Sequence, residues 1–154
     1  MNSPGEPEVK LCNCLALRQA TRYVTQFYDQ YLMPTGVRAT QFSILAKLKR
    51  LGSATINVLA EEMVMDRTTL GRNIQPLQRE GLIAVTQGRT DRRSKELQLT
   101  DAGAARLSAA TAAWAEAQAQ FETVFGDKRA SDLRAMLRAV TASELGPAEA
   151  GTAI

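Results

Sequence analysis

The chain has 154 residues, of which 45% are hydrophobic, and it carries 19 lysine and arginine residues against 16 aspartate and glutamate residues. This length and hydrophobic content predict one compact domain with a buried core. The sequence contains no histidine, which excludes Ser/His/Asp and Cys/His catalytic sites as well as zinc sites with imidazole ligands. We therefore expect a protein that is not an enzyme and that needs no metal and no cofactor.

The sequence shows neither a signal peptide nor an apolar run long enough to cross a bilayer, so we expect a soluble cytoplasmic protein without a membrane partner. Its positive charge is unevenly distributed. The segment from Arg67 to Lys95 holds seven basic residues against two acidic ones, whereas the rest of the chain has a slight acidic excess. A basic island of this kind predicts a surface that binds a polyanion.

Residues 1–10 are predicted to form a flexible leader, because they are rich in proline, glycine and acidic residues. Apolar residues at helical spacing predict a first helix over 11–33, which Pro34 and Gly36 end. A second helix is predicted from about residue 38 to residue 51, before Gly52.

A helix-turn-helix is predicted next. Its first helix covers about residues 56 to 63 and is expected to bury Val58, Leu59 and Met63. Asp66 is a favourable N-cap for a second helix that runs to about residue 79, with Leu70, Ile74 and Leu77 facing inward. Pro76 is expected to kink or loosen this helix, because it lacks the amide that would bond to the Arg72 carbonyl.

Two runs of strand character, "LIAVTQ" and "KELQLT", flank the densest part of the basic island. They predict a β-hairpin with a basic tip. A long helix then begins after the N-cap Thr100. It carries a seven-residue repeat that indicates close packing between helices, formed by Leu107, Ala110, Trp114, Ala117, Phe121 and Val124. A last helix is predicted over about 128–144, and residues 145–154 are predicted to be a disordered tail.

Several segments resemble the MarR family of bacterial winged-helix transcription regulators. The similar segments are "LRQATRYVTQFYDQYLMPTGV", "QFSIL", "DRTTLGRNIQPLQREGLI" and "DRRSKELQLTDAG". The resemblance covers residues 11–143 and implies a mainly helical fold with a small β-hairpin wing. It also implies a winged helix-turn-helix over about 38–100 and a dimerisation region formed by helices at 11–33 and 101–144. A homodimer would then bind a palindromic operator in double-stranded DNA.

The start of the helix after Asp66 offers the side chains expected of a major-groove reader. Arginine can bond to guanine, asparagine to adenine, and threonine to phosphate or a thymine methyl. The candidate residues are Arg67, Thr68, Thr69, Arg72 and Asn73. The alternative is that the threonines are ordinary first-turn residues and that Arg72 is a solvated charge. Thr55 is a further candidate, either for a phosphate contact or as a simple N-cap.

In the hairpin tip, Arg93 matches the arginine that the family inserts into the minor groove, where the negative potential is strong. Asp91 is expected to pair with a nearby arginine and fix its direction. Arg89, Arg92 and Lys95 are assigned to phosphate contacts. The alternative is a solvated basic loop without a partner.

Many family members release DNA when a small aromatic, often anionic molecule binds near the dimer-forming helices. Side chains that could line such an effector pocket are Tyr23, Phe27, Tyr28, Tyr31 and Arg38. The same aromatic residues could equally form core or dimer interface. Cys12 and Cys14 raise the hypothesis of a redox switch, although a bond between them within one helix would be strained. The plainer interpretation is that they are small residues at a dimer-forming helix.

These observations predict a sequence-specific DNA-binding transcription repressor. It would be relieved by an aromatic or anionic ligand or, failing that, by cysteine oxidation. One alternative is an architectural DNA-binding protein that binds many sequences and has no effector. Another is a protein-interaction module whose basic hairpin docks on an acidic partner.

Overall fold

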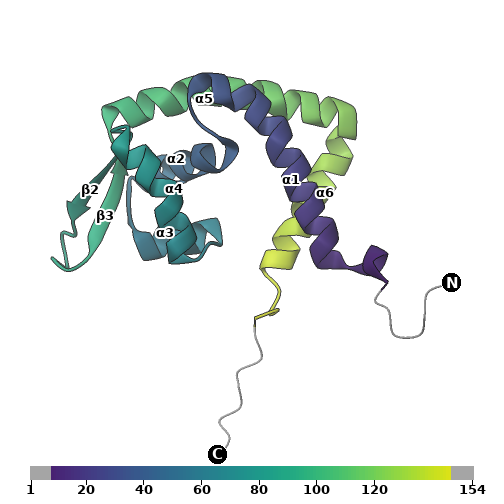
Figure 1. Cartoon of the computed structure of the whole chain (residues 1–154), viewed down its shortest axis with the longest axis horizontal. Helices are drawn as coiled ribbons and strands as arrows, with labels where there is room; N and C mark the ends of the chain where they lie inside the picture. Colours follow the sequence, from purple (N-terminus) through teal and green to yellow (C-terminus); the bar gives the residue numbers. More distant parts are fainter. Residues whose placement is uncertain (1–7, 147–154) are drawn as a thin grey trace, which may run out of the picture. The chain divides into compact units, whose positions relative to one another are not determined.

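The structure is a computed structural model that describes residues 8–146. The chain is mainly helical with one small sheet (Figure 1). The elements, in chain order, are the 3-10 helix η1 (Val9–Leu11), α1 (Asn13–Leu32), the 3-10 helix η2 (Met33–Thr35), α2 (Ala39–Leu51), β1 (Ser53–Thr55), α3 (Ile56–Met63), α4 (Arg67–Arg79), β2 (Ile83–Gln87), β3 (Lys95–Leu99), α5 (Asp101–Phe125) and α6 (Asp127–Thr141).

The chain divides into two compact units, Met1–Ala117 and Gln118–Ile154, and α5 runs from the first into the second. The predicted leader and tail fall largely on residues 1–7 and 147–154, which lie outside the described residues. Among the residues that are described, no helix is long and apolar enough to cross a membrane.

The sheet is antiparallel with the strand order β1-β3-β2, so β3 lies in the middle. Val85 of β2 and Ala54 of β1 both pair with Leu97 of β3. The predicted β2–β3 hairpin is confirmed, and it projects from the α2–α4 helices (Figure 1). The sequence did not predict β1, because a three-residue strand is too short to show an alternating pattern.

The core of the first unit lies between α2, α3, α4 and the sheet. The inward residues predicted for α4, namely Leu70, Ile74 and Leu77, are each at most 4% exposed. Leu45 and Leu48 of α2 are fully buried with them. Burial of five such side chains contributes on the order of 10 kcal/mol to folding, so α4 is held by its apolar face while its other face is left to solvent.

In α3, the prediction that Val58 is buried was wrong. Val58 is 44% exposed, while Leu59 and Ala60 are buried. Thr55 is the N-cap of this helix. The helix α4 is continuous through Pro76, and Glu80 N–H bonds to the Pro76 carbonyl at 3.0 Å.

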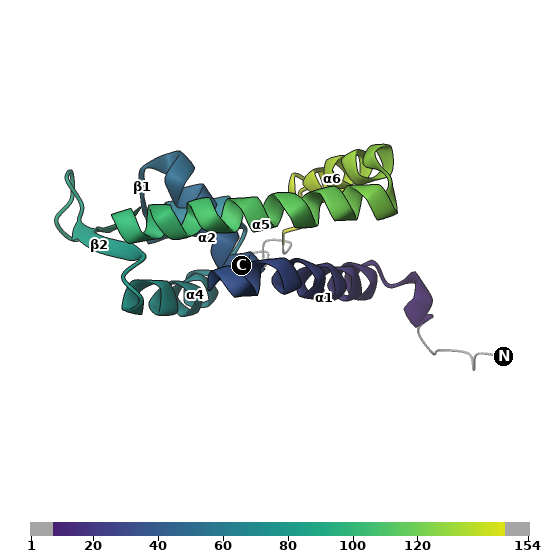
Figure 2. The same cartoon turned by 90° about the horizontal axis from the view of Figure 1, so that it is seen from above.

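The start of α5 lies against the connection between α4 and β2, at the end of the first unit from which the hairpin projects (Figure 2). Thr100 Oγ1 accepts a hydrogen bond from Gly103 N–H at 3.0 Å and donates one to the Gly81 carbonyl at 2.5 Å. A Cβ on Gly103 would lie 2.0 Å from the Leu82 carbonyl oxygen, so only glycine fits there. This contact explains the glycine in the segment "LTDAG".

Arg106 of α5 joins two further elements of the first unit. Its Nη1 donates a hydrogen bond to the Gly36 carbonyl at 3.2 Å and lies 3.5 Å from Glu80 Oε2. Gly36 lies in the α1–α2 connection, and Glu80 is the C-cap of α4. One guanidinium therefore bonds to both the α1–α2 connection and the end of α4.

Candidate nucleic-acid interface

The helix α4 begins at a well-formed N-cap. Asp66 Oδ1 accepts a hydrogen bond from Thr69 N–H at 2.8 Å, and Asp66 Oδ2 accepts one from the Thr69 hydroxyl at 2.6 Å. These bonds, the hydroxyl bond first, lower the pKa of the Asp66 carboxyl, because they favour its charged form. The first turn of α4 is thereby fixed, and so is the position of the side chains that it carries.

The five candidate residues on α4 fall into two groups. Arg67, Thr68 and Arg72 are exposed, and none of their side chains bonds to another described residue. Thr69 is engaged in the cap, and Asn73 Nδ2 donates a hydrogen bond to the Thr69 carbonyl at 2.9 Å. The structure therefore leaves Arg67, Thr68 and Arg72 available to a ligand, while Thr69 and Asn73 have partners within their own helix.

The hairpin tip is an ordered turn. Gly88 N–H bonds to the Ser94 carbonyl at 2.8 Å, and Ser94 N–H bonds to the Asp91 carbonyl at 3.1 Å. The Asp91 side chain accepts a hydrogen bond from the backbone N–H of Arg93 at 2.9 Å. Asp91 makes no ion pair with an arginine among residues 8–146, so the expected pairing was wrong. A carboxylate two residues before an amide forms this local turn readily, and Asp91 thus fixes the backbone of Arg93.

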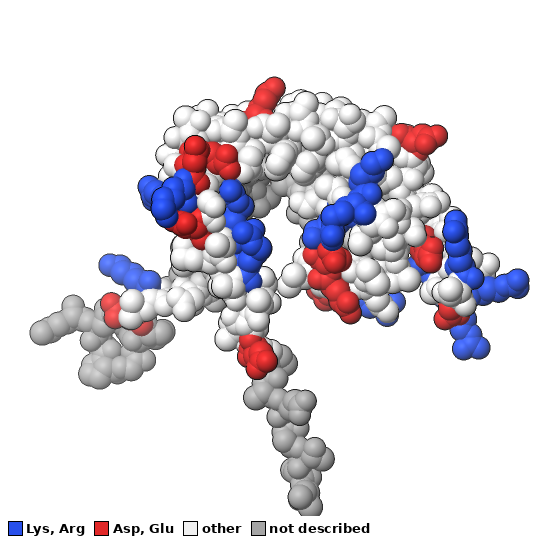
Figure 3. Space-filling view, turned by 180° about the vertical axis from the view of Figure 1, so that it is seen from behind, with Lys and Arg blue, Asp and Glu red and all other residues white. Residues whose placement is uncertain are grey.

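The basic side chains of the hairpin are all turned to solvent. Arg89, Arg92, Arg93 and Lys95 are exposed, and positive side chains gather on the hairpin at the right of the view in Figure 3. None of them bonds through its side chain to another described residue. The wing therefore presents three arginines on the loop between the paired strands and Lys95 at the start of β3.

Thr55 is the N-cap of α3, and its hydroxyl oxygen accepts a hydrogen bond from Val58 N–H at 3.3 Å. The simple capping role proposed for Thr55 is therefore present. Its hydroxyl proton has no partner among the described residues, so this atom could still donate to a phosphate.

A charged cluster that sequence reasoning missed joins α2 to α3. Lys47 Nζ lies 3.0 Å from Glu62 Oε2, and Arg50 contacts the same oxygen. The hydrogen bond from Lys47, followed by the charge of Arg50, lowers the pKa of Glu62. Residues that are 12 and 15 positions apart show no local signal for such contacts. The cluster ties the first helix of the helix-turn-helix to α2.

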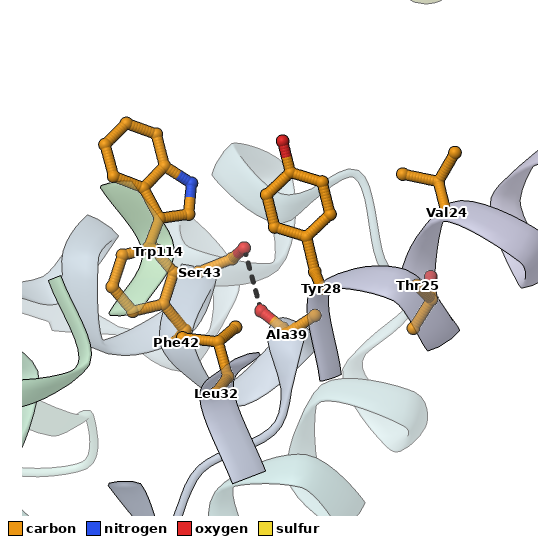
Figure 4. Close-up of a pocket in the computed structure, with 8 residues that line it drawn as sticks. All are labelled: Val24, Thr25, Tyr28, Leu32, Ala39, Phe42, Ser43 and Trp114. Atoms are coloured by element: carbon orange, nitrogen blue, oxygen red, sulfur yellow. Dashed lines mark hydrogen bonds between the residues drawn. The ribbon is translucent and has the colours of Figure 1, made fainter. Parts of the chain in front are cut away.

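A cavity of about 210 Å³ lies between α1, α2 and the middle of α5. Its lining residues are Val24, Thr25, Tyr28, Leu32, Ala39, Phe42, Ser43 and Trp114. The rings of Phe42 and Trp114 are stacked at 6.0 Å, and Figure 4 shows Tyr28 on the other side of the Ser43 hydroxyl. The walls therefore hold three aromatic rings and three hydroxyl groups, and no lining side chain is charged.

Only Tyr28 of the five expected pocket residues lines this cavity. Tyr23 is 77% exposed. Phe27 and Tyr31 pack on each other with ring centroids 5.4 Å apart. Arg38 lies 3.6 Å from Asp29 in an ion pair in which Arg38 is exposed and Asp29 is largely buried. Helical spacing correctly grouped the four aromatic residues on α1, whereas Arg38 is the N-cap of α2. Spacing could not identify Phe42 and Trp114, which α2 and α5 supply.

Cys12 and Cys14 are both exposed free thiols. Cys12 is the N-cap of α1, with extended backbone, and its Sγ accepts a hydrogen bond from Leu15 N–H at 3.4 Å. The expectation that both cysteines lie within one helix was wrong, because α1 begins at Asn13 and Cys12 only caps it. Within residues 8–146, no cluster of three potential metal ligands is present.

Comparison with known proteins identifies this arrangement. The MarR family profile matches residues 37–95. Over 87% of its length the chain is similar to the transcriptional regulator MOSR of M. tuberculosis, solved in complex with DNA, with 35% identity, a TM-score of 0.74 and 99% of that chain covered. The chain belongs to the MarR family.

Two further relatives agree with the MarR assignment. The repressor CouR, solved bound to a 23-mer DNA duplex, is 25% identical, with a TM-score of 0.78 over 92% of this chain and 99% of that one. The transcriptional repressor MdtR of Bacillus subtilis is 37% identical over 68 residues, which span only 44% of either chain. The chain thus matches less than half the length of this curated relative.

The MarR membership confirms the winged-helix fold predicted from the sequence. MarR regulators bind DNA and are not enzymes, so the prediction of a protein without catalytic activity is also confirmed. Within this MarR domain, the family profile ends at residue 95. It therefore includes the helix-turn-helix and the tip of the wing, where the exposed arginines lie.

Proposed function

We propose that this transcription regulator is a sequence-specific repressor that binds double-stranded DNA in the cytoplasm. The observation that carries the proposal is the pairing of two exposed cationic features on one rigid winged-helix unit. Thr68 and Arg72 present donors on the outer side of α4, Arg67 is exposed at its first turn, and the hairpin presents Arg92 and Arg93. Arg72 and Thr68 suit base edges in the major groove, and Arg93 suits the narrow minor groove beside it.

The remaining polar residues divide by residue type and by the hydrogen bonds that they already make. Arg89, Arg92 and Lys95 are proposed to contact phosphates, as is Thr55, whose hydroxyl proton remains free. Thr69 and Asn73 would reach bases only by giving up the hydrogen bonds that they make in α4. Asp91 acts on DNA indirectly, by fixing the backbone at Arg93.

We propose further that the protein binds a palindromic operator as a homodimer, through the regions 11–33 and 101–144, with the winged unit over 38–100. In support, α6 exposes Met136, Leu137 and Val140 at 60%, 40% and 42%. Apolar side chains in such number on one helix are expected to be covered by a partner. A dimer would place two copies of α4 about one helical turn of DNA apart.

The cavity beside Trp114 is proposed to hold the effector. A volume of about 210 Å³ and a stacked Phe42–Trp114 pair suit one small aromatic molecule. Since no lining residue is charged, a neutral aromatic ligand fits these walls better than an anion. The alternative control, oxidation of Cys12 and Cys14, is supported by the exposure of both thiols.

The decisive experiment is selection of bound duplexes from a random DNA pool. The selected duplex and a random duplex are then compared in binding titrations at the same salt concentrations. Sequence-specific repression requires tighter binding of the selected duplex by about 10³-fold or more. Equal affinities with equal salt slopes would instead support an architectural DNA-binding protein. Absence of duplex binding at low salt would support the module that docks on an acidic protein.

The same titration separates the two forms of control. Peroxide treatment should leave the affinity unchanged, with both thiols still open to alkylation, if a ligand rather than oxidation relieves repression. Loss of affinity that a thiol reductant restores would assign the control to Cys12 and Cys14.

A further inference from the structure

The helix α4 carries a glycine, Gly71, that the fold does not require. A Cβ added at Gly71 would meet no atom within 4 Å, and its φ is not positive. At Gly103, by contrast, the same Cβ would lie 2.0 Å from a backbone oxygen. A glycine in the middle of a helix destabilises that helix relative to alanine, so neither packing nor backbone conformation explains Gly71.

The position of Gly71 on the helix suggests what does explain it. Gly71, Gln75 and Gln78 are spaced four and three residues apart, so they share one side of α4. This side adjoins the outward row of Thr68 and Arg72. The outward direction of α4 is the one opposite its buried side chains, Leu70, Ile74 and Leu77. At about 100° per residue, Gly71 lies roughly 90° around the helix from that direction. We call the surface formed by Gly71, Gln75 and Gln78 the glycine flank.

The two glutamines of the glycine flank are exposed, and neither side chain bonds to another described residue. Together with Arg79 they line a shallow hollow of about 530 Å³. An amide carries two N–H donors and no charge. Gly71 is not among the lining residues of this hollow. The glycine flank therefore offers two neutral donors, beside the cation Arg79 and next to a position where the helix has no side chain.

We infer that the glycine flank is where the sugar-phosphate backbone of one DNA strand approaches α4 most closely. The inference rests on the proposed DNA-binding function. A helix of about 10–12 Å diameter nearly fills a major groove of about 12 Å width. Its outward row then faces base edges, while its flanks face the phosphate walls. On the glycine flank, the absence of a Cβ at Gly71 lets the sugar-phosphate backbone come close to the helix. Gln75 and Gln78 donate hydrogen bonds to its phosphate oxygens.

If the inference is correct, substitution of Gly71 should make the protein more stable and its binding to DNA weaker. We expect Gly71→Ala to raise the melting temperature by about 2–4 °C and to weaken binding of the selected duplex by tenfold or more. Gly71→Leu should weaken binding further, because its side chain is larger. Ser108→Ala, which exchanges an exposed residue of α5, is the matched control: it should raise stability without a loss of affinity.

The glutamines give a second readout. Gln75→Ala and Gln78→Ala should each weaken binding severalfold without a change in the salt dependence, because an amide releases no counterion. Loss of a cationic phosphate contact such as Lys95, by comparison, reduces the slope by about 1.

Three results would overturn the inference while leaving the proposed function intact. They are wild-type affinity in Gly71→Ala, a lower melting temperature in that variant, and a change in the bases that it selects at one position of the site. The last result would mean that a base edge, and not the backbone, meets Gly71. If the wild-type protein binds no duplex, the proposed function itself fails and the inference fails with it.

Discussion

The carboxylate of Asp91 accepts a hydrogen bond from the backbone N–H of Arg93 at 2.9 Å, and it forms no ion pair with the Arg93 guanidinium. Asp91 therefore shapes the turn that carries Arg93 while leaving the guanidinium free. An acid in the middle of a DNA-binding loop is electrostatically unfavourable for binding. The hydrogen bond that Asp91 accepts in the turn compensates for this unfavourable charge, because it fixes the backbone at Arg93.

We expect Asp91→Ala to weaken DNA binding about three- to tenfold, the equivalent of one ordinary hydrogen bond, although it removes a negative charge. Asp91→Asn should retain the affinity, since its side-chain oxygen can accept the same bond. Fluorescence anisotropy with a labelled selected duplex measures both variants. If Asp91→Ala binds more tightly than the wild type, charge outweighs turn geometry and the role of Asp91 is wrong.

Arg93→Ala should weaken binding of the selected duplex about tenfold more than Lys95→Ala. An arginine in the minor groove benefits from the concentrated negative potential there, whereas a lysine at a phosphate supplies a single exposed charge. Each variant should lower the slope of log affinity against log salt concentration by about 1. Equal losses for the two variants at matched salt would remove the special role of Arg93.

The cap of α4 should make the protein sensitive to acid. The folded state lowers the pKa of Asp66, so the stability that its charge contributes is present above the unfolded-state pKa of about 3.9 and is lost as the pH falls through the lower, folded-state value. The asparagine side chain in the variant Asp66→Asn still caps the helix but does not titrate. Thermal unfolding between about pH 5 and pH 2 should therefore show a smaller loss of stability in Asp66→Asn. Identical acid profiles for the two proteins would contradict the prediction.

The single tryptophan of the chain provides a direct probe of the cavity. Because Trp114 lines the cavity and stacks on Phe42, a neutral aromatic ligand should change Trp114 fluorescence in a saturable titration. Phe42→Ala should weaken that ligand by about 1–2 kcal/mol, or roughly five- to thirtyfold, through loss of aromatic contact. An unchanged affinity in Phe42→Ala would place the ligand elsewhere.

The exposed apolar side chains of α6 predict a dimer interface that an added charge would disrupt. Leu137→Glu should shift the protein toward monomer in analytical ultracentrifugation, because a buried unpaired carboxylate disfavours association. Ser131→Glu adds the same charge to the same helix, about 120° away from Leu137, and should leave the dimer intact. If both variants remain dimeric at low micromolar concentration, α6 does not form the interface.

Local chemistry made α4 and the wing predictable from the sequence. The cap at Asp66, the inward spacing of Leu70, Ile74 and Leu77, and the strands that flank the loop each depend on residues that are close together in the sequence. The lining of the cavity was not predictable in the same way. Phe42 and Trp114 lie far apart in the chain, and the α2–α5 packing that stacks their rings leaves no local pattern.

Hydrogen-bond occupancy was a second limit of sequence reasoning. Thr69 and Asn73 have suitable side chains for base contacts, yet Asp66 and the backbone of α4 already engage them. Glu62 likewise shows no sequence signal for its two basic partners, because they lie on the preceding helix. In each case the residue type was informative, but its partner could only be known from the fold.

Arg106 links the cavity helix α5 to two other elements of the first unit. It lies eight residues before Trp114, about two turns along the same helix, and its guanidinium bonds to Gly36 and to Glu80 at the end of α4. A helix is stiff along its axis, so a ligand that pushes α5 at Trp114 would move Arg106 as well. Both bonds would then loosen in the same movement, and the C-terminal end of α4 would lose its bond to Arg106 while its apolar face stays packed in the core.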